Sequence, residues 1–206
     1  MTGYVKIPLS MLIEEVGEDN AKQILSDFSC PLNKDIEKFL RVTAIEFEKQ
    51  QLSRTQLIFA SYREENVLVA YYTLAIKSFN ITSAALTPAL RRRINKYSTY
   101  DPVLKAHILP APLIAQLGKN FSNGYNKLIT GDELLKMACD DVQLVQSMVG
   151  GKIAYLECED CPKLVDFYTS NGFVEFDKRR LDSDETDIKG EHLVQMLKVF
   201  KRKCTT

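Results

Sequence analysis

One tyrosine stands on a short predicted helix whose start and end are both marked in the sequence. A β-type run at 153–156 is followed by Pro162, which suits the first position of a helix, and Gly172 stands where a helix C-terminus needs a left-handed residue. Between them, one apolar stripe is formed by Leu164, Val165, Phe167 and Tyr168. The block 152–173 therefore predicts strand, helix and strand. The phenol that projects from this helix can donate a hydrogen bond or a proton.

A glycine-containing turn ahead of a long helix is the second place where the sequence could do chemistry. A strand predicted at 113–117 is followed by a loop at 118–125 and by a helix from about 128 to 148, ended by Gly150 and Gly151. A helix N-terminus presents unpaired amides and the positive end of its dipole, so this turn could bind an anion such as a pyrophosphate. The alternative is an ordinary connection, because strand–loop–helix turns that contain a glycine are common.

Cys158 and Cys161 form the one cysteine pair with the spacing of metal ligands. Zinc would need two more ligands, and with only His107 and His192 elsewhere we expect no metal site. The cysteines are odd in number and scattered, and no secretory signal precedes them, so we expect reduced thiols at Cys30, Cys139, Cys158, Cys161 and Cys204. Cys158 as an acyl-carrying nucleophile is a weaker possibility, because no histidine lies near it in sequence.

The block around the tyrosine resembles the C-terminal half of the GNAT superfamily of acetyl-CoA-dependent N-acyltransferases. The last helix of that family ends Phe/Leu-Tyr, three residues, Gly-Phe, and here the run is Phe167-Tyr168-Thr169-Ser170-Asn171-Gly172-Phe173. The resemblance implies acetyl-CoA as the acyl donor and Tyr168 as the catalytic residue that assists the departing CoA thiolate. It covers roughly 28–200. Phe28-Ser29-Cys30 and Tyr71-Tyr72-Thr73-Leu74 look like the branch that contains the aminoacyl-tRNA-acetylating toxins.

The same resemblance assigns the turn at 117–131 to acetyl-CoA. GNAT proteins carry Gln/Arg-x-x-Gly-x-Gly/Ala there, and alignment places Asn126 at the Gln/Arg position, Ile129 at the first glycine and Gly131 at the last. Because Ile129 departs from that pattern, it stays open which amides bind the pyrophosphate. The residues expected to bind acetyl-CoA are Leu117, Gly118, Lys119, Asn126, Lys127, Ile129, Thr130 and Gly131.

In the mechanism that the resemblance implies, an amine attacks the thioester directly. The strands at 113 and 153 would splay apart to admit the pantetheine arm, and a backbone N–H near Leu117 would stabilise the oxyanion. Many GNAT enzymes place a carboxylate on the strand before the pyrophosphate turn, but 113–117 has none. Glu157, a water chain and the solvent remain as possible bases.

The elements that must position these residues alternate between helix and strand. We expect short helical pieces at 10–27 with Ser10 as an N-cap, an amphipathic helix at 33–51, and a hairpin of strands 56–62 and 67–76 joined at 63–66. The helix at 33–51 should bury its apolar residues, which are Ile36, Phe39, Leu40, Ile45 and Phe47. Residues 79–109 read as a surface excursion with a basic helical piece at 90–96, and further strands are expected at 174–176 and 192–200. The order predicts an α/β (α+β) GNAT fold, a mixed, mostly antiparallel sheet flanked by helices.

Length and composition favour one domain over residues 1–206, with 45% hydrophobic residues to build its core. The N-terminus lacks a signal-peptide pattern, and the longest apolar run, 67–76, is shorter than the roughly 20 residues of a membrane span. We therefore expect a cytoplasmic protein without membrane contact. The oligomeric state is open.

Three functions from different classes compete. A small-molecule or protein amine N-acetyltransferase is favoured, a toxin that acetylates aminoacyl-tRNA is the runner-up, and a CoA-binding module without catalysis is third. Lys plus Arg equals Asp plus Glu at 27 each, so no global positive field attracts nucleic acid. A basic run such as 91–93 is usually a solvated helix face. An acidic loop is expected before the last strand, and it would repel a phosphate backbone if it borders the substrate cleft; its acidic residues are Asp182, Asp184, Glu185 and Asp187.

Overall fold

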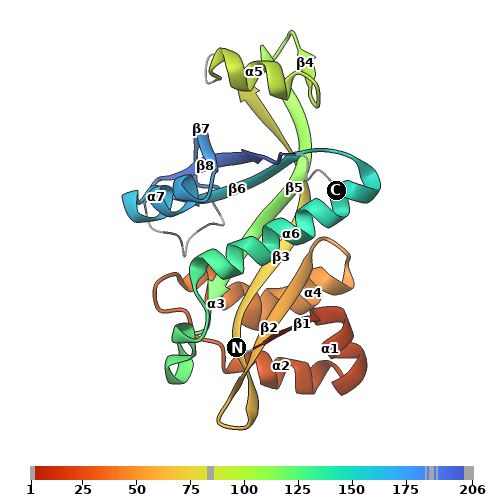
Figure 1. Cartoon of the computed structure of the whole chain (residues 1–206), viewed down its shortest axis with the longest axis vertical. Coiled ribbons are helices and arrows are strands. Elements are labelled where there is room, and N and C mark those ends of the chain that lie inside the picture. Colours follow the sequence, from red (N-terminus) through yellow and green to blue (C-terminus); the bar gives the residue numbers. More distant parts are fainter. Residues whose placement is uncertain (1–2, 83–85, 184, 186–187, 189, 202–206) are drawn as a thin grey trace. The chain divides into compact units, whose positions relative to one another are not determined.

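A computed structural model describes residues 3–82, 86–183, 185, 188 and 190–201 (Figure 1). It divides into two compact units. The first is built mainly from residues up to 75 and from 114–139, and the second from 76–113, 140–185 and the C-terminal region. Three long elements, β3 (Glu65–Thr82), β5 (Ala106–Lys119) and α6 (Gly131–Val149), belong partly to each unit. A single folding domain remains our proposal, because these three elements are shared by both units.

The N-terminal helices of the first unit are α1 (Leu9–Val16) and α2 (Glu18–Ser26), which confirms the helical pieces predicted at 10–27. The predicted N-cap at Ser10 is wrong. A five-residue strand, β1 (Tyr4–Pro8), runs directly into α1, so Pro8 holds the N-cap position without a side-chain hydrogen bond. Gly17 separates the two helices at φ 81°, in the left-handed region that glycine adopts without strain.

The helix predicted at 33–51 is one helical stretch with a π-helical turn inside it. Its parts are α3 (Lys34–Lys38), the π-helix η1 (Phe39–Thr43) and α4 (Ala44–Lys49). The Asn33 side chain caps the start by accepting a hydrogen bond from the Ile36 amide at 3.1 Å. Leu40 and Ile45 are buried as predicted, but Phe47 is exposed. A π turn adds a residue to the spiral and rotates the positions after it, which a regular 3.6-residue period does not anticipate.

The predicted hairpin is formed by β2 (Arg54–Tyr62) and β3, and β1 adds a third antiparallel strand at Tyr4↔Ala60. The connection is shorter than the predicted 63–66. Only Arg63 and Glu64 lie outside the strands, and both have positive φ. Positive φ at both central residues is what a two-residue hairpin turn needs to match the twist of its strands. The helices α1 to α4 bury their apolar faces against Leu57, Leu68 and Tyr71 of this sheet.

In the second unit, the surface excursion predicted at 79–109 is mostly regular structure. Strand β3 continues to Thr82 because Phe79 and Ile81 are buried in the core, and β5 already begins at Ala106. Between them lie α5 (Pro88–Ile94) and β4 (Thr99–Asp101), which pairs antiparallel with β5. The predicted basic helical piece is confirmed as α5.

The second unit also contains β6 (Ile153–Glu159), α7 (Pro162–Ser170), β7 (Val174–Arg180) and β8 (His192–Val199). Strand β8 pairs antiparallel with both β6 and β7, whereas β5 and β6 are parallel and share a single register pair, Leu113↔Tyr155. The hydrogen-bonded order is β1-β2-β3-β5-β6-β8-β7, with β4 beside β5. The mixed, mostly antiparallel sheet is therefore confirmed.

The core of the second unit is centred on aromatic rings from three strands. Phe79 stacks on Tyr155 with ring centroids 4.0 Å apart, and Phe176 and Leu197 belong to the same cluster. Within the described ranges, no helix combines the length and the apolarity needed to cross a bilayer. The predicted acidic loop lies partly outside the described residues, since Asp184 and Asp187 are not among them, and the same is true of Cys204.

Candidate functional site

The turn between β5 and α6, in the first unit, is closed by the side chain of Lys119. Its ammonium donates hydrogen bonds to the carbonyl of Asn126 at 3.0 Å and to that of Ile129 at 3.2 Å. The 3-10 helix η3 (Ser122–Lys127) fills the turn, with Asn123 and Gly124 at positive φ. Three residues predicted to bind acetyl-CoA are thus joined by direct contacts. The charge of Lys119 is directed at the backbone of the turn.

A buried asparagine that the sequence analysis missed holds the start of this turn. The Asn120 side-chain oxygen accepts hydrogen bonds from the amides of Ser29 and Ser122, both at 3.0 Å, and its amide group donates to the Leu68 carbonyl at 2.8 Å. The Phe28-Ser29-Cys30 segment that carried part of the resemblance is therefore anchored to the turn. An asparagine next to a strand end gives no sequence signal of such a role, because two of its three partners, Leu68 and Ser29, are 52 and 91 residues away.

Reciprocal hydrogen bonds cap α6 at the N-terminus. The Glu133 carboxylate accepts from the Thr130 amide at 2.8 Å and from its hydroxyl at 2.7 Å, and the Glu133 amide donates to the Thr130 hydroxyl at 3.2 Å. These hydrogen bonds lower the pKa of Glu133, with the Thr130 amide as the largest cause. Tyr4 adds a hydroxyl donor to Glu133 and to the Leu128 carbonyl. The pattern is a capping box, which a Thr-x-x-Glu sequence can reveal.

Gly118 is required by close packing in the first unit. A Cβ atom at this position would lie less than 3.0 Å from Cγ2 of Ile36 and 3.2 Å from the Tyr71 ring. The Tyr71 hydroxyl donates to the Ile36 carbonyl at 2.6 Å, so α3 is fastened to the sheet beside this glycine. Leu117, its predicted cofactor-binding neighbour, is partly buried.

The remaining predicted cofactor-binding residues differ in exposure. Ile129 is buried, so its bulk is packed in the protein interior. Asn126 and Gly131 are partly exposed, and Lys127 and Thr130 are exposed. The side chain that Ile129 carries in place of a glycine is therefore accommodated in the interior of the first unit.

Tyr168 lies in the last turn of α7, in the second unit. Its ring makes edge contacts with Phe167 and Phe173, at centroid distances of 4.9 and 5.9 Å, and its carbonyl accepts from the Phe173 amide at 3.0 Å. Gly172 adopts φ 82°, as predicted for the helix end. Within the part of the chain that the structure describes, the Tyr168 hydroxyl makes no hydrogen bond. Burial raises the pKa of this phenol and Cys158 adds to the rise, so the group stays protonated at neutral pH.

The Cys158 thiol is a poor nucleophile. Burial raises its pKa to about 12, and the carboxylates of Glu175 and Asp160 add to the rise. At neutral pH the side chain is therefore a thiol and not the reactive thiolate. Cys30, Cys139, Cys158 and Cys161 are not joined in disulfides. The described residues contain no group of three histidine, cysteine or acidic side chains close enough to hold a metal.

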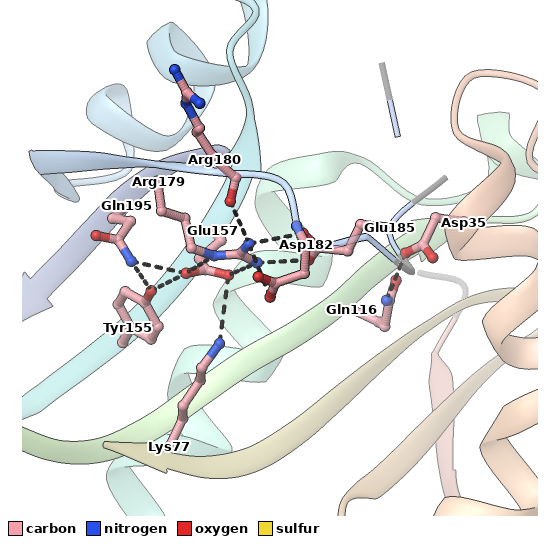
Figure 2. A network of polar contacts seen from close by, with 10 residues as sticks. All are labelled: Asp35, Lys77, Gln116, Tyr155, Glu157, Arg179, Arg180, Asp182, Glu185 and Gln195. Atoms are coloured by element: carbon pink, nitrogen blue, oxygen red, sulfur yellow. Dashed lines mark hydrogen bonds and ion pairs between the residues drawn. The ribbon is translucent and has the colours of Figure 1, made fainter. Parts of the chain in front are cut away.

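A polar network on the strands of the second unit surrounds Glu157 (Figure 2). Its carboxylate accepts two hydrogen bonds from the Arg179 guanidinium, at 2.9 and 2.7 Å, one from Gln195 at 3.0 Å and one from the Tyr155 hydroxyl. The Lys77 ammonium lies 3.7 Å away. Burial alone would raise the pKa of Glu157, but the hydrogen bonds from Arg179, Tyr155 and Gln195 outweigh it and lower the pKa to about 2. Such a carboxylate is a weak base.

Arg179 also binds the segment that follows β7. Its two terminal nitrogens donate to the Glu185 carboxylate at 2.8 and 2.6 Å, and Asp182 lies 3.5 Å away (Figure 2). Two members of the predicted acidic loop are thus neutralised in part by an arginine that the sequence analysis did not consider.

A pocket of about 320 Å³ lies elsewhere in the second unit. It is formed by the C-terminal end of α6, by residues 109–112 of β5 and by the start of β6, with Leu109, Val145 and Ile153 among its lining residues. None of the predicted site residues lines it.

Comparisons with known proteins identify the fold. No protein-family model matches the sequence, and no curated protein matches it. Among solved structures, AtaT complexed with acetyl-methionyl-tRNAfMet is 19% identical, with a TM-score of 0.61 over 93% of this chain and 94% of that one. A Tyr-to-Phe mutant of KacT is 15% identical, with a TM-score of 0.62 over 95% and 94%. AtaTR bound with AcCoA is 16% identical, with a TM-score of 0.54 over 93% and 91%. The chain therefore has the GNAT acyltransferase fold that its tyrosine block and its turn before α6 predict.

Proposed function

We propose that this protein is an acetyl-CoA-dependent N-acetyltransferase in which Tyr168 assists the departing CoA thiolate. The observation that carries the proposal is the setting of this phenol. It stands at the end of α7 in a chain with the GNAT fold, packed through its ring, protonated at neutral pH, and without a hydrogen bond to any described residue. Tyr168 is only partly buried and its hydroxyl is not engaged by any described residue, so the phenol is available to donate a hydrogen bond to a bound ligand.

The donor cosubstrate in this proposal is acetyl-CoA, bound by residues 117–131. The capping box engages the amides of Thr130 and Glu133, so we assign the diphosphate to the Gly131 amide and the exposed Lys127 ammonium, with the dipole of α6 adding attraction. The residues fit such a ligand because Lys119 and Asn120 already fix the backbone of the turn. The structural neighbour AtaTR, which was solved with AcCoA, supports this assignment.

The chemistry is a direct acyl transfer. The neutral amine attacks the thioester carbonyl, a C–N bond forms, and collapse of the tetrahedral oxyanion breaks the C–S bond. The Leu117 amide is our proposed donor to the oxyanion, and the Tyr168 hydroxyl donates its proton or a hydrogen bond to the thiolate. The proton lost by the amine passes to water, because the lowered pKa of Glu157 makes that carboxylate a weak base.

An aminoacyl-tRNA is the acceptor that the neighbours favour. AtaT, in complex with acetyl-methionyl-tRNAfMet, matches nearly the whole of both chains. The argument against a polynucleotide rested on the balanced net charge and on the acidic loop, and the pairing of Glu185 with Arg179 removes part of the negative charge of that loop. A small-molecule or protein amine, which the sequence alone favours, is the competing acceptor.

Two measurements test the proposal. Acetyl-CoA at a hundredfold excess over its dissociation constant should stabilise the protein by about 2.7 kcal/mol, visible as a raised melting temperature and as binding in calorimetry. Gly131→Glu should weaken that binding by adding bulk and like charge beside the diphosphate. Thiol release from acetyl-CoA is then compared between charged tRNA and a library of amines. Absence of both acetyl-CoA binding and thiol release would refute the assignment as an acetyltransferase. Faster thiol release with the amines than with charged tRNA would refute tRNA as the acceptor.

A further inference from the structure

Residues 86–107 of the second unit form a strongly cationic segment, which we call the α5–β4 segment. It contains five cationic residues, Arg91, Arg92, Arg93, Lys96 and Lys105, and one carboxylate, Asp101. The chain as a whole carries equal numbers of the two signs. The positive charge is therefore concentrated here and is not a property of the composition.

The single carboxylate of the segment does not neutralise these cations. Asp101 accepts hydrogen bonds from the amides of Val103 and Leu104, at 2.8 and 3.0 Å, and so stabilises its own turn. Arg92, Arg93, Lys96 and Lys105 are exposed and make no ion pair with any residue in the described ranges.

Charged residues on the other helices are arranged differently. Lys22 and Lys49 both pair with Glu18, and Lys34 pairs with Glu37. An ordinary solvated helix face mixes the two signs in this way. The α5–β4 segment does not.

The segment is held firmly although its charged face is open. Ile94 and Leu86 are buried in the core of the second unit together with Leu109. The Ser98 hydroxyl donates to the Ile94 carbonyl at 3.0 Å and lies 3.1 Å from Nδ1 of His107, so the end of α5 is tied to β5. A surface that is already ordered loses little conformational freedom when it binds a partner.

An aromatic ring accompanies the cations. Tyr100 pairs across the β4–β5 ladder with His107, their ring centroids are 5.2 Å apart, and 49% of Tyr100 is exposed. Cations beside an exposed aromatic ring are the combination that binds nucleic acid, because phosphates pair with the charges and an unpaired base can stack on the ring.

We propose that the α5–β4 segment is the surface that docks the phosphate backbone of an acceptor tRNA. This inference rests on the proposed function, in which the acceptor amine is carried by tRNA. Exposed Val103 and Leu104 at the turn would also suit an acidic protein, and the experiment below separates that partner from RNA.

The first experiment measures binding of labelled, deacylated tRNA across a series of salt concentrations. The test variant carries Arg92→Gln, Arg93→Gln, Lys96→Gln and Lys105→Gln. The matched control removes four exposed cations of the first unit through Lys22→Gln, Lys34→Gln, Lys49→Gln and Arg63→Gln. The test variant should bind about tenfold or more weakly, and the slope of log K against log salt should fall by roughly 0.7 to 0.9 for each phosphate that is no longer neutralised. An equal weakening in the test variant and the control would overturn the proposal.

Two further arms separate this inference from the proposed function and from the other partner. Calorimetry with acetyl-CoA on the same proteins should give unchanged binding in the test variant. Wild-type protein that binds acetyl-CoA but no tRNA would overturn this inference and the tRNA acceptor, and would leave the acetyl-CoA-dependent enzyme in place. Binding of tRNA without binding of acetyl-CoA would overturn the enzyme and leave the docking surface in place. Poly-glutamate should compete poorly with tRNA. Competition as strong as that of unlabelled tRNA would overturn the RNA assignment in favour of an acidic protein.

Discussion

Glu157 and Arg179 face each other from strands β6 and β7, with Nε 2.9 Å from one carboxylate oxygen and Nη2 2.7 Å from the other. This two-point contact is strong because both partners are charged and their planes match. Gln195 on β8, the strand that pairs with both, donates to the same carboxylate. The carboxylate of Glu157, which the sequence suggests as a possible general base, therefore links side chains of β6, β7 and β8. Through Arg179 it is also linked to Glu185.

The first prediction concerns stability against pH. Folding lowers the pKa of Glu157 from an ordinary value near 4.5 to about 2, so the group stabilises the native state above pH 4.5 and the stabilisation is lost as the pH falls from about 4.5 to about 2. The contribution at neutral pH is on the order of 3 kcal/mol. Urea unfolding of wild type and Glu157→Gln at a series of pH values should give a difference in the free energy of unfolding that becomes smaller as the pH falls from about 4.5 to about 2.

Other carboxylates also titrate between pH 5 and 2, so only the difference between the two proteins is diagnostic. Arg180→Gln provides a control, because it removes an exposed neighbouring cation and should change stability by less than about 0.5 kcal/mol. A difference between wild type and Glu157→Gln that stays constant down to pH 2 would contradict the lowered pKa.

The second prediction concerns the close packing at Gly118. Gly118→Ala would place a Cβ atom less than 3.0 Å from Cγ2 of Ile36, and the overpacking should destabilise the protein by about 1–3 kcal/mol. Gly3→Ala is the matched control, because nothing lies within 4 Å of its added Cβ. Adding Ile36→Ala to Gly118→Ala should relieve the clash, so the two changes should be strongly non-additive in denaturant unfolding. Additive effects would show that the two side chains do not meet.

The third prediction concerns the cap of α6. Thr130→Ala removes the hydroxyl that accepts from the Glu133 amide, and should cost about 1 kcal/mol of stability. Thr130→Ser keeps the oxygen and should cost much less. Chemical denaturation of the two variants gives the comparison, and equal destabilisation of both would mean that the methyl group, not the cap, stabilises this turn.

Local sequence signals predicted the block that carries Tyr168. Pro162 at the helix start and Gly172 at φ 82° mark the two ends of α7, and each acts within its own turn. The capping box at Thr130 and Glu133 is equally local and could have been read from the sequence. By contrast, the π turn at 39–43 has no composition signature, and its rotation of α4 made the burial prediction for Phe47 wrong.

Long-range contacts set the parts of the site that the sequence analysis missed. Glu157 and Arg179 are 22 residues apart and meet only because β8 aligns β6 with β7. The role of Asn120 depends on three segments that fold together around its side chain. Neither can be derived from periodicity or spacing, because strand register is a tertiary property.

The last prediction concerns Tyr168. Tyr168→Phe keeps the ring contacts with Phe167 and Phe173 and deletes the hydroxyl, so the variant should fold and bind acetyl-CoA as wild type does. Loss of the donor to the thiolate should lower kcat by roughly a hundredfold or more with little change in the KM for acetyl-CoA. Because burial raises the pKa of the phenol, the wild-type rate should show no loss from ionisation of Tyr168 as the pH rises from 7 to 9.

Steady-state kinetics over that pH range, after a check of the melting temperature, measures both effects in one set of proteins. Tyr62→Phe is the control, since it deletes the hydroxyl of another partly buried tyrosine that lies outside the proposed acetyl-CoA and tRNA surfaces, and it should leave kcat unchanged. A Tyr168→Phe variant with full kcat would mean that the thiolate leaves without a proton donor. The phenol would then serve packing alone, and the catalytic role would have to be sought among the other groups near α7.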